Sequence, residues 1–291
     1  MHPAFNAIVD YAGLFPPAAC AMDDAVARYA DYRQSSDRAM LGRFVVGAGR
    51  LAELAEAVAA LGPAAPTADA PWGLSVVVGE DHGGALEAIV ALGTGGALRV
   101  EALEARIDTP ASVPVVAGRL AGPWELFLEV PHLSDYAPLL EAIQASGAQA
   151  KLRTGGVTAE AFPSAPVVAR FLATAVRLAV PFKATAGLHH PWRGHYPLTY
   201  APDAPRAAMF GFVAVLLATA ALRGGAEESV AQAILDDEDP AAFAPEPGGM
   251  RWREMSFAAG ELETARRLSF RGFGSCSFRE PVDELTQEVG T

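Results

Sequence analysis

Two lysines, at positions 151 and 183, are the residues of this chain best suited to covalent chemistry. They are the only lysines among the 22 basic residues, and all the others are arginines. Arginine keeps its charge at any physiological pH, whereas its surroundings can make a lysine neutral and nucleophilic. Two retained lysines therefore indicate amine chemistry, although buried cations held in ion pairs are an alternative explanation.

Both lysines fall in short apolar runs of the kind that form strands. Such runs alternate with helical patterns along the whole chain, which predicts a parallel sheet. We count eight strands, at 7–11, 43–46, 74–78, 98–102, 126–130, around Lys151, around Lys183, and at 269–274. Eight strands predict an α/β fold, a single (β/α)8 barrel over residues 1–291.

The segment 191–253 is too long for one crossover between the seventh and eighth strands. Its pattern predicts at least two helices, at 206–222 and 227–235, together with irregular chain. The sequence therefore predicts a helical insertion within the single domain, between strands seven and eight.

In a barrel of this kind, the reacting groups come from the carboxyl ends of the strands. This rule selects Asp10 and Glu101 as candidates for proton transfer and Glu129 as a further pocket residue. Each carboxylate taken alone could equally be a solvated or ion-paired strand end. If the two lysine strands are neighbours, each ammonium group lowers the pKa of the other, and desolvation acts in the same direction. One lysine would then be a free amine that can form a Schiff base with a carbonyl.

Several segments are similar, in the same order along nearly the whole chain, to segments of one known family. The segments 151–155 (Lys-Leu-Arg-Thr-Gly) and 183–187 (Lys-Ala-Thr-Ala-Gly) resemble two successive strands of the deoxyribose-phosphate aldolases, the first of which carries that family's Schiff-base lysine. The turn 273–277 (Phe-Gly-Ser-Cys-Ser) resembles the family's phosphate-binding turn. The opening strand 8–11 and the Leu-Glu pair at 128–129 are also similar.

The resemblance implies that Lys151 is the nucleophile and that Lys183 lowers its pKa. It also implies that an anionic group is held by a set of small residues, namely Thr154, Gly155, Gly187, Gly274 and Ser275. Arg153 and His189 are expected to contact the rest of the substrate. The chain departs from the family at Glu125, where the family has a lysine, and at Arg153, where the family has a small polar residue. A guanidinium at position 153 would suit a carboxylate or phosphate.

Three histidines, His189, His190 and His195, follow the seventh strand closely. Together with Glu101 or Glu129 they could bind a metal ion. Adjacent histidines point in different directions on an extended chain, and the spacing matches no zinc signature. We therefore expect no metal or other cofactor. Cys276 has no evident histidine partner and is expected to be a small core residue.

The bulk composition narrows the range of partners. The net charge of −12 argues against nucleic acid and anionic membranes, which require a basic face. Two cysteines and the absence of a signal-peptide pattern favour the cytoplasm. The run 207–222 is uncharged for 16 residues, too short to span a bilayer, and is expected to be core or the interface of a homo-oligomer.

The sequence as a whole predicts a cytoplasmic class I aldolase or related lyase. Its substrate would be a small carbonyl metabolite that bears a phosphate or carboxylate. One alternative is a metal-assisted barrel lyase or hydrolase that uses the histidine loop 189–195. The other is a barrel without catalytic activity that binds an anionic metabolite.

Overall fold

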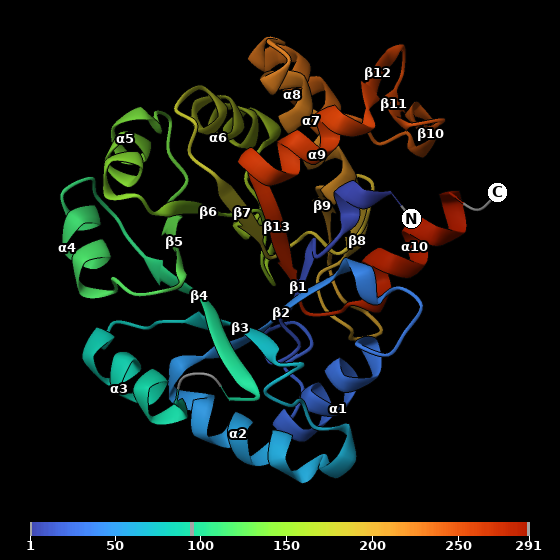
Figure 1. Ribbon diagram of the computed structural model, residues 1–291. Helices are drawn as coiled ribbons and strands as arrows, with labels where there is room; N and C mark the ends of the chain where they lie inside the picture. The colour runs from blue at the N-terminus through green and yellow to red at the C-terminus, as the bar shows by residue number, and fades with distance from the viewer. Residues whose placement is uncertain (1, 94–95, 290–291) are drawn as a thin grey trace.

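The computed structural model describes residues 2–93 and 96–289, and its centre is a closed barrel of eight parallel strands (Figure 1). Around the barrel the strands follow the order β1-β13-β7-β6-β5-β4-β3-β2. They are β1 (Val9–Tyr11), β2 (Leu41–Gly47), β3 (Trp72–Val77), β4 (Leu98–Arg106), β5 (Glu125–Val130), β6 (Gln149–Arg153), β7 (Phe182–Thr185) and β13 (Phe270–Ser275). The predicted (β/α)8 barrel is confirmed.

The α-helices surround the barrel and cover the outer face of its strands (Figure 1). They are α1 (Met22–Tyr32), α2 (Leu51–Ala60), α3 (His82–Leu92), α4 (Ser112–Arg119), α5 (Ala137–Ser146), α6 (Ala165–Arg177), α7 (Phe212–Arg223), α8 (Glu228–Asp236), α9 (Ala259–Leu268) and α10 (Arg279–Val289). Short 3-10 helices are η1 (Pro3–Phe5), η2 (Arg38–Met40), η3 (Ala48–Arg50), η4 (Gly62–Ala64), η5 (Ala159–Ala161) and η6 (Pro240–Ala242).

The spacing of apolar residues explains how these helices pack. In α6 the buried positions include Val168, Phe171, Leu172 and Ala175, which repeat at three- and four-residue intervals and form one face. Helix α7 is different, because every residue from 212 to 221 is buried. Helix α7 packs against α6, α8 and α9, and it is apolar on all sides because these helices cover it. The apolar run is therefore part of the core.

The largest differences from the predicted elements lie after β7. Helix α7 begins at Phe212, and residues Arg206–Met209 form a strand, β9, that pairs antiparallel with β8 (Gly194–Pro197). A second small antiparallel sheet consists of β10 (Phe243–Glu246), β11 (Gly249–Trp252) and β12 (Met255–Ala258). It lies at the edge of the molecule near α9 (Figure 1). The segment 191–253 is therefore partly helical and partly β-structure.

Two further differences concern the barrel itself. Helices α4 and α9 were not predicted, and β4 continues four residues beyond its predicted end at Ala102.

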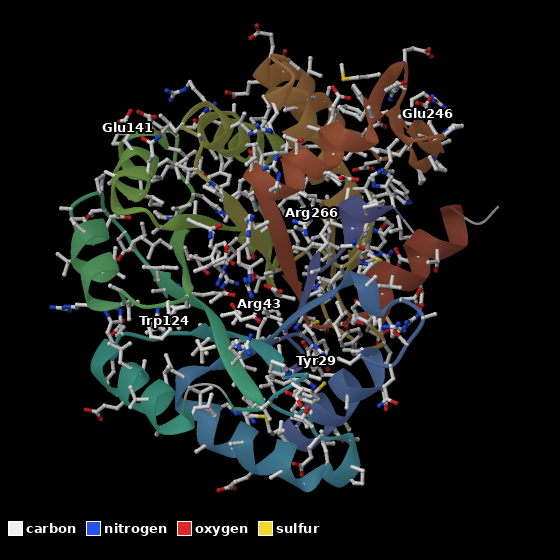
Figure 2. All side chains as sticks on the ribbon, in the orientation of Figure 1. Tyr29, Arg43, Trp124, Glu141, Glu246 and Arg266 are labelled. Carbon is white, nitrogen blue, oxygen red and sulfur yellow. The ribbon has the colours of Figure 1, made fainter. Side chains whose placement is uncertain are left out.

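Within the described residues, no helix has both the length and the apolar character needed to cross a bilayer. Charged side chains such as Arg43 and Arg266 lie near the centre of the barrel, whereas Glu141 and Glu246 lie at the periphery (Figure 2). Buried charged groups inside the barrel form the candidate site described next.

Candidate active site

The two lysines lie side by side on neighbouring strands. Strands β6 and β7 pair in parallel, and their register places Lys151 opposite Lys183 and Arg153 opposite Thr185. Both lysines are buried, with exposed fractions of 5% and 2%. The expectation that the two lysine strands are neighbours is confirmed.

A carboxylate from β4, Glu104, lies between the two ammonium groups. Its Oε2 is 2.6 Å from Nζ of Lys151, and its Oε1 is 2.6 Å from Nζ of Lys183. The hydroxyl of Ser75, on β3, donates a third hydrogen bond of 2.6 Å to Oε1. The lysines therefore interact through a shared negative charge, because Glu104 bridges them.

This bridge reverses the effect that we expected on the pKa of Lys183. Burial alone would raise the pKa of Glu104, but the two ammonium groups outweigh burial and hold that pKa far below its usual range. Burial alone would lower the pKa of Lys183, but Asp10 and Glu104 outweigh it and raise that pKa. The expectation that the paired lysines weaken each other's protonation is wrong for Lys183.

Two more carboxylates extend the bridge in opposite directions. Asp10 Oδ2 lies 2.6 Å from Nζ of Lys183, and Glu129 Oε2 lies 2.9 Å from Nζ of Lys151. The five residues Asp10, Lys183, Glu104, Lys151 and Glu129 thus form a continuous line of buried opposite charges, which we call the charge chain. It crosses the interior of the barrel from β1 to β5.

One end of the charge chain reaches a cavity of about 710 Å3 at the carboxyl ends of the strands. We call this cavity the lysine pocket. Its charged or titratable lining residues are Glu80, His82, Glu104, Arg106, Asp108, Glu129, Lys151, Arg153, His189 and Cys276. The carboxylate of Glu129 pairs there with Nε of Arg106 at 3.2 Å and with Nε of Arg153 at 3.4 Å. Lys151 and the arginines together make this carboxylate more acidic, because they lower the pKa that burial alone would raise.

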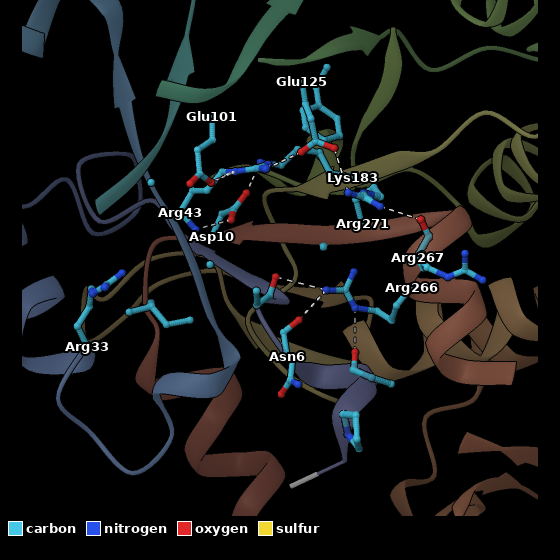
Figure 3. Close-up of a pocket in the computed structure, with 18 of the residues that line it drawn as sticks. Asn6, Asp10, Arg33, Arg43, Glu101, Glu125, Lys183, Arg266, Arg267 and Arg271 are labelled. Atoms are coloured by element: carbon cyan, nitrogen blue, oxygen red, sulfur yellow. Dashed lines mark hydrogen bonds and ion pairs between the residues drawn. The ribbon is translucent and has the colours of Figure 1, made fainter. Parts of the chain in front are cut away.

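The other end of the charge chain reaches a cavity of about 460 Å3 at the amino ends of the strands (Figure 3). We call it the arginine pocket, because Arg33, Arg43, Arg266, Arg267 and Arg271 all line it. Lys183 and Asp10 line this pocket too. Each of the two lysines is therefore in contact with a different cavity.

Glu101 lies in the arginine pocket, which corrects its predicted position at the carboxyl end of β4. Its carboxylate pairs with Nε of Arg43 at 3.1 Å, and the same guanidinium reaches Glu125 at 2.5 Å (Figure 3). Because β4 extends to Arg106, Glu104 occupies the position that Glu101 was expected to hold.

Glu104 was missed because a bulge breaks the two-residue periodicity of β4. Leu74 on β3 pairs with Val100, whereas Ser75 pairs with Ala102, so Glu101 is an extra residue on β4. The bulge allows Glu101 and Glu104, three residues apart, both to lie inside the barrel, which regular alternation forbids. The segment Leu-Glu-Ala-Arg at 103–106 continues the strand pattern and is the one signal that could have revealed Glu104.

The residues expected to bind the substrate are divided between different environments. Arg153, His189 and Gly274 line the lysine pocket, and Gly187 lines a smaller adjacent cavity. Thr154 donates a hydrogen bond of 2.6 Å to the carbonyl of Ala186. Gly155 packs on Phe162, and Ser275 lies against His189, so these two residues and Thr154 support the loops behind the pocket wall.

The three histidines of the loop point to different partners. His189 Nδ1 lies 3.3 Å from Glu280, His190 Nδ1 lies 2.8 Å from Glu284, and exposed His195 approaches Glu238 at 4.0 Å. The ring of His190 also stacks on Tyr196, with ring centroids 3.3 Å apart. Among the described residues, no group of three or more His, Cys, Asp or Glu side chains could hold a metal ion.

His189 is also the partner that the sequence did not reveal for Cys276. Its Nδ1 lies 3.9 Å from the Cys276 sulfur and 3.2 Å from the Ser275 hydroxyl. Burial alone would lower the pKa of His189, but Cys276 and Glu280 raise it to about 9. His189 is therefore a cation at neutral pH on the wall of the lysine pocket.

The chain was compared with protein-family models, with curated proteins and with solved structures, and none of them matches. The functional argument therefore depends on the geometry of the pocket. That geometry places one buried amine, the two buried carboxylates that contact it and two guanidinium groups around one cavity at the carboxyl end of a (β/α)8 barrel.

Proposed function

We propose that this protein is a Schiff-base-forming class I aldolase or lyase in which Lys151 is the nucleophile. One observation carries the proposal: Lys151 lines the lysine pocket, and its Nζ lies between Glu104 and Glu129, at 2.6 and 2.9 Å. Active sites of (β/α)8 barrels are found at this end of the barrel. The resemblance of 151–155 to the Schiff-base strand of the deoxyribose-phosphate aldolases supports the same assignment.

Lys151 is a better nucleophile candidate than Lys183 because of where each amine lies. Lys151 lines the cavity at the carboxyl end, whereas Lys183 is only 2% exposed and lines the opposite cavity. Lys183 also has a raised pKa, caused by Asp10 and Glu104 against the effect of burial. In this proposal Lys183 remains an ammonium group that fixes the Glu104 carboxylate beside Lys151.

The charge balance of Schiff-base formation fits the carboxylates around Lys151. When an alkylammonium group reacts with a carbonyl, the products are one iminium ion and one water molecule. The nitrogen loses two protons, both of which leave in the water, and the site keeps its single positive charge. Glu104 and Glu129 therefore stabilise the iminium ion as they stabilise the ammonium group.

The same carboxylates can move the protons that the reaction requires. Before attack, the Lys151 ammonium group must give a proton to a neighbouring base, and both carboxylates lie within hydrogen-bonding distance. One of them then returns a proton to the hydroxyl that leaves as water. In the lyase direction, a carboxylate also accepts the proton of a hydroxyl β to the iminium carbon as the carbon–carbon bond breaks.

The two guanidinium groups suit an anionic group on the substrate. Arg106 and Arg153 line the pocket, and 77% and 40% of their side-chain surface is exposed. They share one carboxylate partner there, Glu129. Because two guanidinium groups share this one carboxylate, one of their positive charges remains available for a carboxylate or phosphate on the substrate. Arginine binds such groups through two parallel hydrogen bonds.

Reductive trapping tests the proposal. The protein is incubated with cyanoborohydride and one carbonyl compound from a panel of acetaldehyde, pyruvate and glyceraldehyde 3-phosphate. Intact-mass spectrometry then measures the increase in mass. We expect one adduct per chain with at least one member of the panel, and no such adduct in Lys151→Arg, which keeps the charge but removes the amine.

A second variant controls for nonspecific reduction. Lys183→Arg also removes one lysine and keeps the charge, but it should leave the trapped position present. If no compound of the panel gives an adduct that depends on Lys151, the barrel binds its ligand without Schiff-base chemistry and the proposal fails.

A further inference from the structure

A second, smaller cavity adjoins the lysine pocket at the carboxyl end of the barrel. Its volume is about 240 Å3. The turn after β1 and the β8–β9 hairpin supply most of its wall, and we call it the hairpin pocket. Its main apolar lining residues are Pro16, Pro17, Pro197, Leu198, Tyr200 and Met209.

The hairpin pocket and the lysine pocket share part of their walls. Pro16, Gly156, Ala186 and His189 line both cavities. Two of these four residues are glycine and alanine, so the shared boundary has little side-chain bulk at those positions. A ligand in the lysine pocket can therefore extend across this boundary into the hairpin pocket.

The backbone at this boundary is held in an unusual conformation. Ala186 and Gly187 have φ angles of 59° and 71°, both in the left-handed region. This region is costly for alanine, and such backbone strain concentrates at ligand sites. A Cβ atom on Gly187 would lie 2.7 Å from the Phe162 ring and 3.1 Å from the Thr154 carbonyl oxygen. The turn after β7 is thus fixed at the point where the two cavities meet.

The titratable groups of the hairpin pocket already have partners. His189 pairs with Glu280 at 3.3 Å, and His190 pairs with Glu284 at 2.8 Å. The hydroxyl of Tyr200 lies 3.6 Å from the Cys276 sulfur. Within the described residues, the wall has no arginine or lysine, the cationic His189 is already paired with Glu280, and most of the surface is apolar.

We propose that the hairpin pocket binds the uncharged, apolar end of the carbonyl substrate whose carbonyl carbon reacts with Lys151. This inference rests on the proposed function and assigns the substrate two ends. The anionic group lies near Arg106 and Arg153, and an aliphatic or aromatic group lies among the prolines, Leu198 and Met209. Each buried methylene should improve binding about 4-fold.

Two aldehydes of different length test the assignment. The rate of cyanoborohydride trapping on Lys151 is measured with hexanal and with acetaldehyde, and the ratio of the two rates is compared between variants. Thr199→Trp and Ala201→Trp fill the pocket from its hairpin side. We expect each to lower the hexanal-to-acetaldehyde ratio at least about 10-fold, since four methylenes lose their site. Val115→Trp, at an exposed position on α4, is the matched control and should keep the wild-type ratio.

A ligand that cannot react separates this inference from the proposed function. Binding of hexan-1-ol is measured by saturation-transfer NMR on the wild type, Thr199→Trp and Val115→Trp. Binding that is lost only in Thr199→Trp supports the hairpin pocket, even if no aldehyde is trapped on Lys151 and the Schiff-base function fails. The inference is overturned if hexan-1-ol does not bind, or if Thr199→Trp changes neither its binding nor the aldehyde ratio.

Discussion

The two ends of the barrel both carry buried charges, but they use them in opposite ways. At the amino end, Arg43 pairs with Glu101 and Glu125, and Arg271 pairs with Glu125 as well. At the carboxyl end, the lysine pocket contains Lys151 within reach of two carboxylates and two guanidinium groups, one largely exposed and one partly exposed. The first arrangement joins segments of the fold, and the second leaves groups available to a ligand.

Arg266 shows the structural use of charge most clearly. Its guanidinium donates to the carbonyls of Ala4, Asn6 and Ala7, at 2.8, 3.0 and 3.3 Å, and so ties the amino-terminal segment to α9 (Figure 3). Burial and the neighbouring Arg271 lower its pKa to about 10. A guanidinium remains charged even there.

The largest expected effect comes from Glu104, which holds both lysines. Glu104→Gln removes the shared charge from two buried ammonium groups, and we expect the free energy of unfolding to fall by about 3–5 kcal/mol. Reductive trapping on Lys151 should slow about 100-fold, because the nearest base is lost. Urea unfolding and trapping rates measure the two effects.

Glu101→Gln is the matched change three residues earlier on the same strand. It should leave the trapping rate within about 2-fold of the wild type, because Glu101 pairs with Arg43 in the arginine pocket. Equal loss of trapping in the two variants would contradict the assignment of Glu104 to the site.

Two arginine substitutions, one at each end of the barrel, should have opposite effects: one should lower stability, and the other should weaken ligand binding. Arg43→Met leaves Glu101 and Glu125 without their shared partner and should lower the free energy of unfolding by about 2 kcal/mol, with little change in trapping. Arg106→Met removes an exposed side chain and should change that free energy by less than about 0.5 kcal/mol. It should instead weaken the binding of an anionic carbonyl compound. Denaturation curves would measure the changes in stability, and trapping at several pyruvate concentrations would measure the change in binding. A large loss of stability in Arg106→Met would contradict the proposed difference between the two ends of the barrel.

The last effect we predict is a dependence of stability on pH, caused by His189. Its pKa is raised to about 9 in the folded chain from an ordinary 6.5, since Cys276 and Glu280 outweigh burial. A raised pKa stabilises the fold fully below pH 6.5, and this contribution disappears as the pH rises through about 9. The free energy of unfolding should therefore fall by about 3 kcal/mol over this range. His189→Gln should show a flatter profile, and an unchanged slope would refute the assignment.

The sequence predicted the barrel because its strands and helices alternate regularly. It also predicted the pairing of the lysine strands, since Lys151 and Lys183 follow one another in consecutive strands. It failed where a strand departs from regular geometry, as at the bulge around Glu101 that conceals Glu104. It also failed in the segment 206–209, where an apolar run begins as strand β9 and continues as helix α7. Hydrophobic periodicity cannot separate a short strand from the start of a buried helix.

Peptide mapping of the trapped adduct is the most direct test of the central claim. The amines available to an aldehyde within the chain are Lys151, Lys183 and the amino terminus. After trapping with acetaldehyde or pyruvate and proteolysis, tandem mass spectrometry should place the reduced adduct on Lys151. An adduct on Lys183 or on the amino terminus, with Lys151 unmodified, would contradict our account of the lysine pocket.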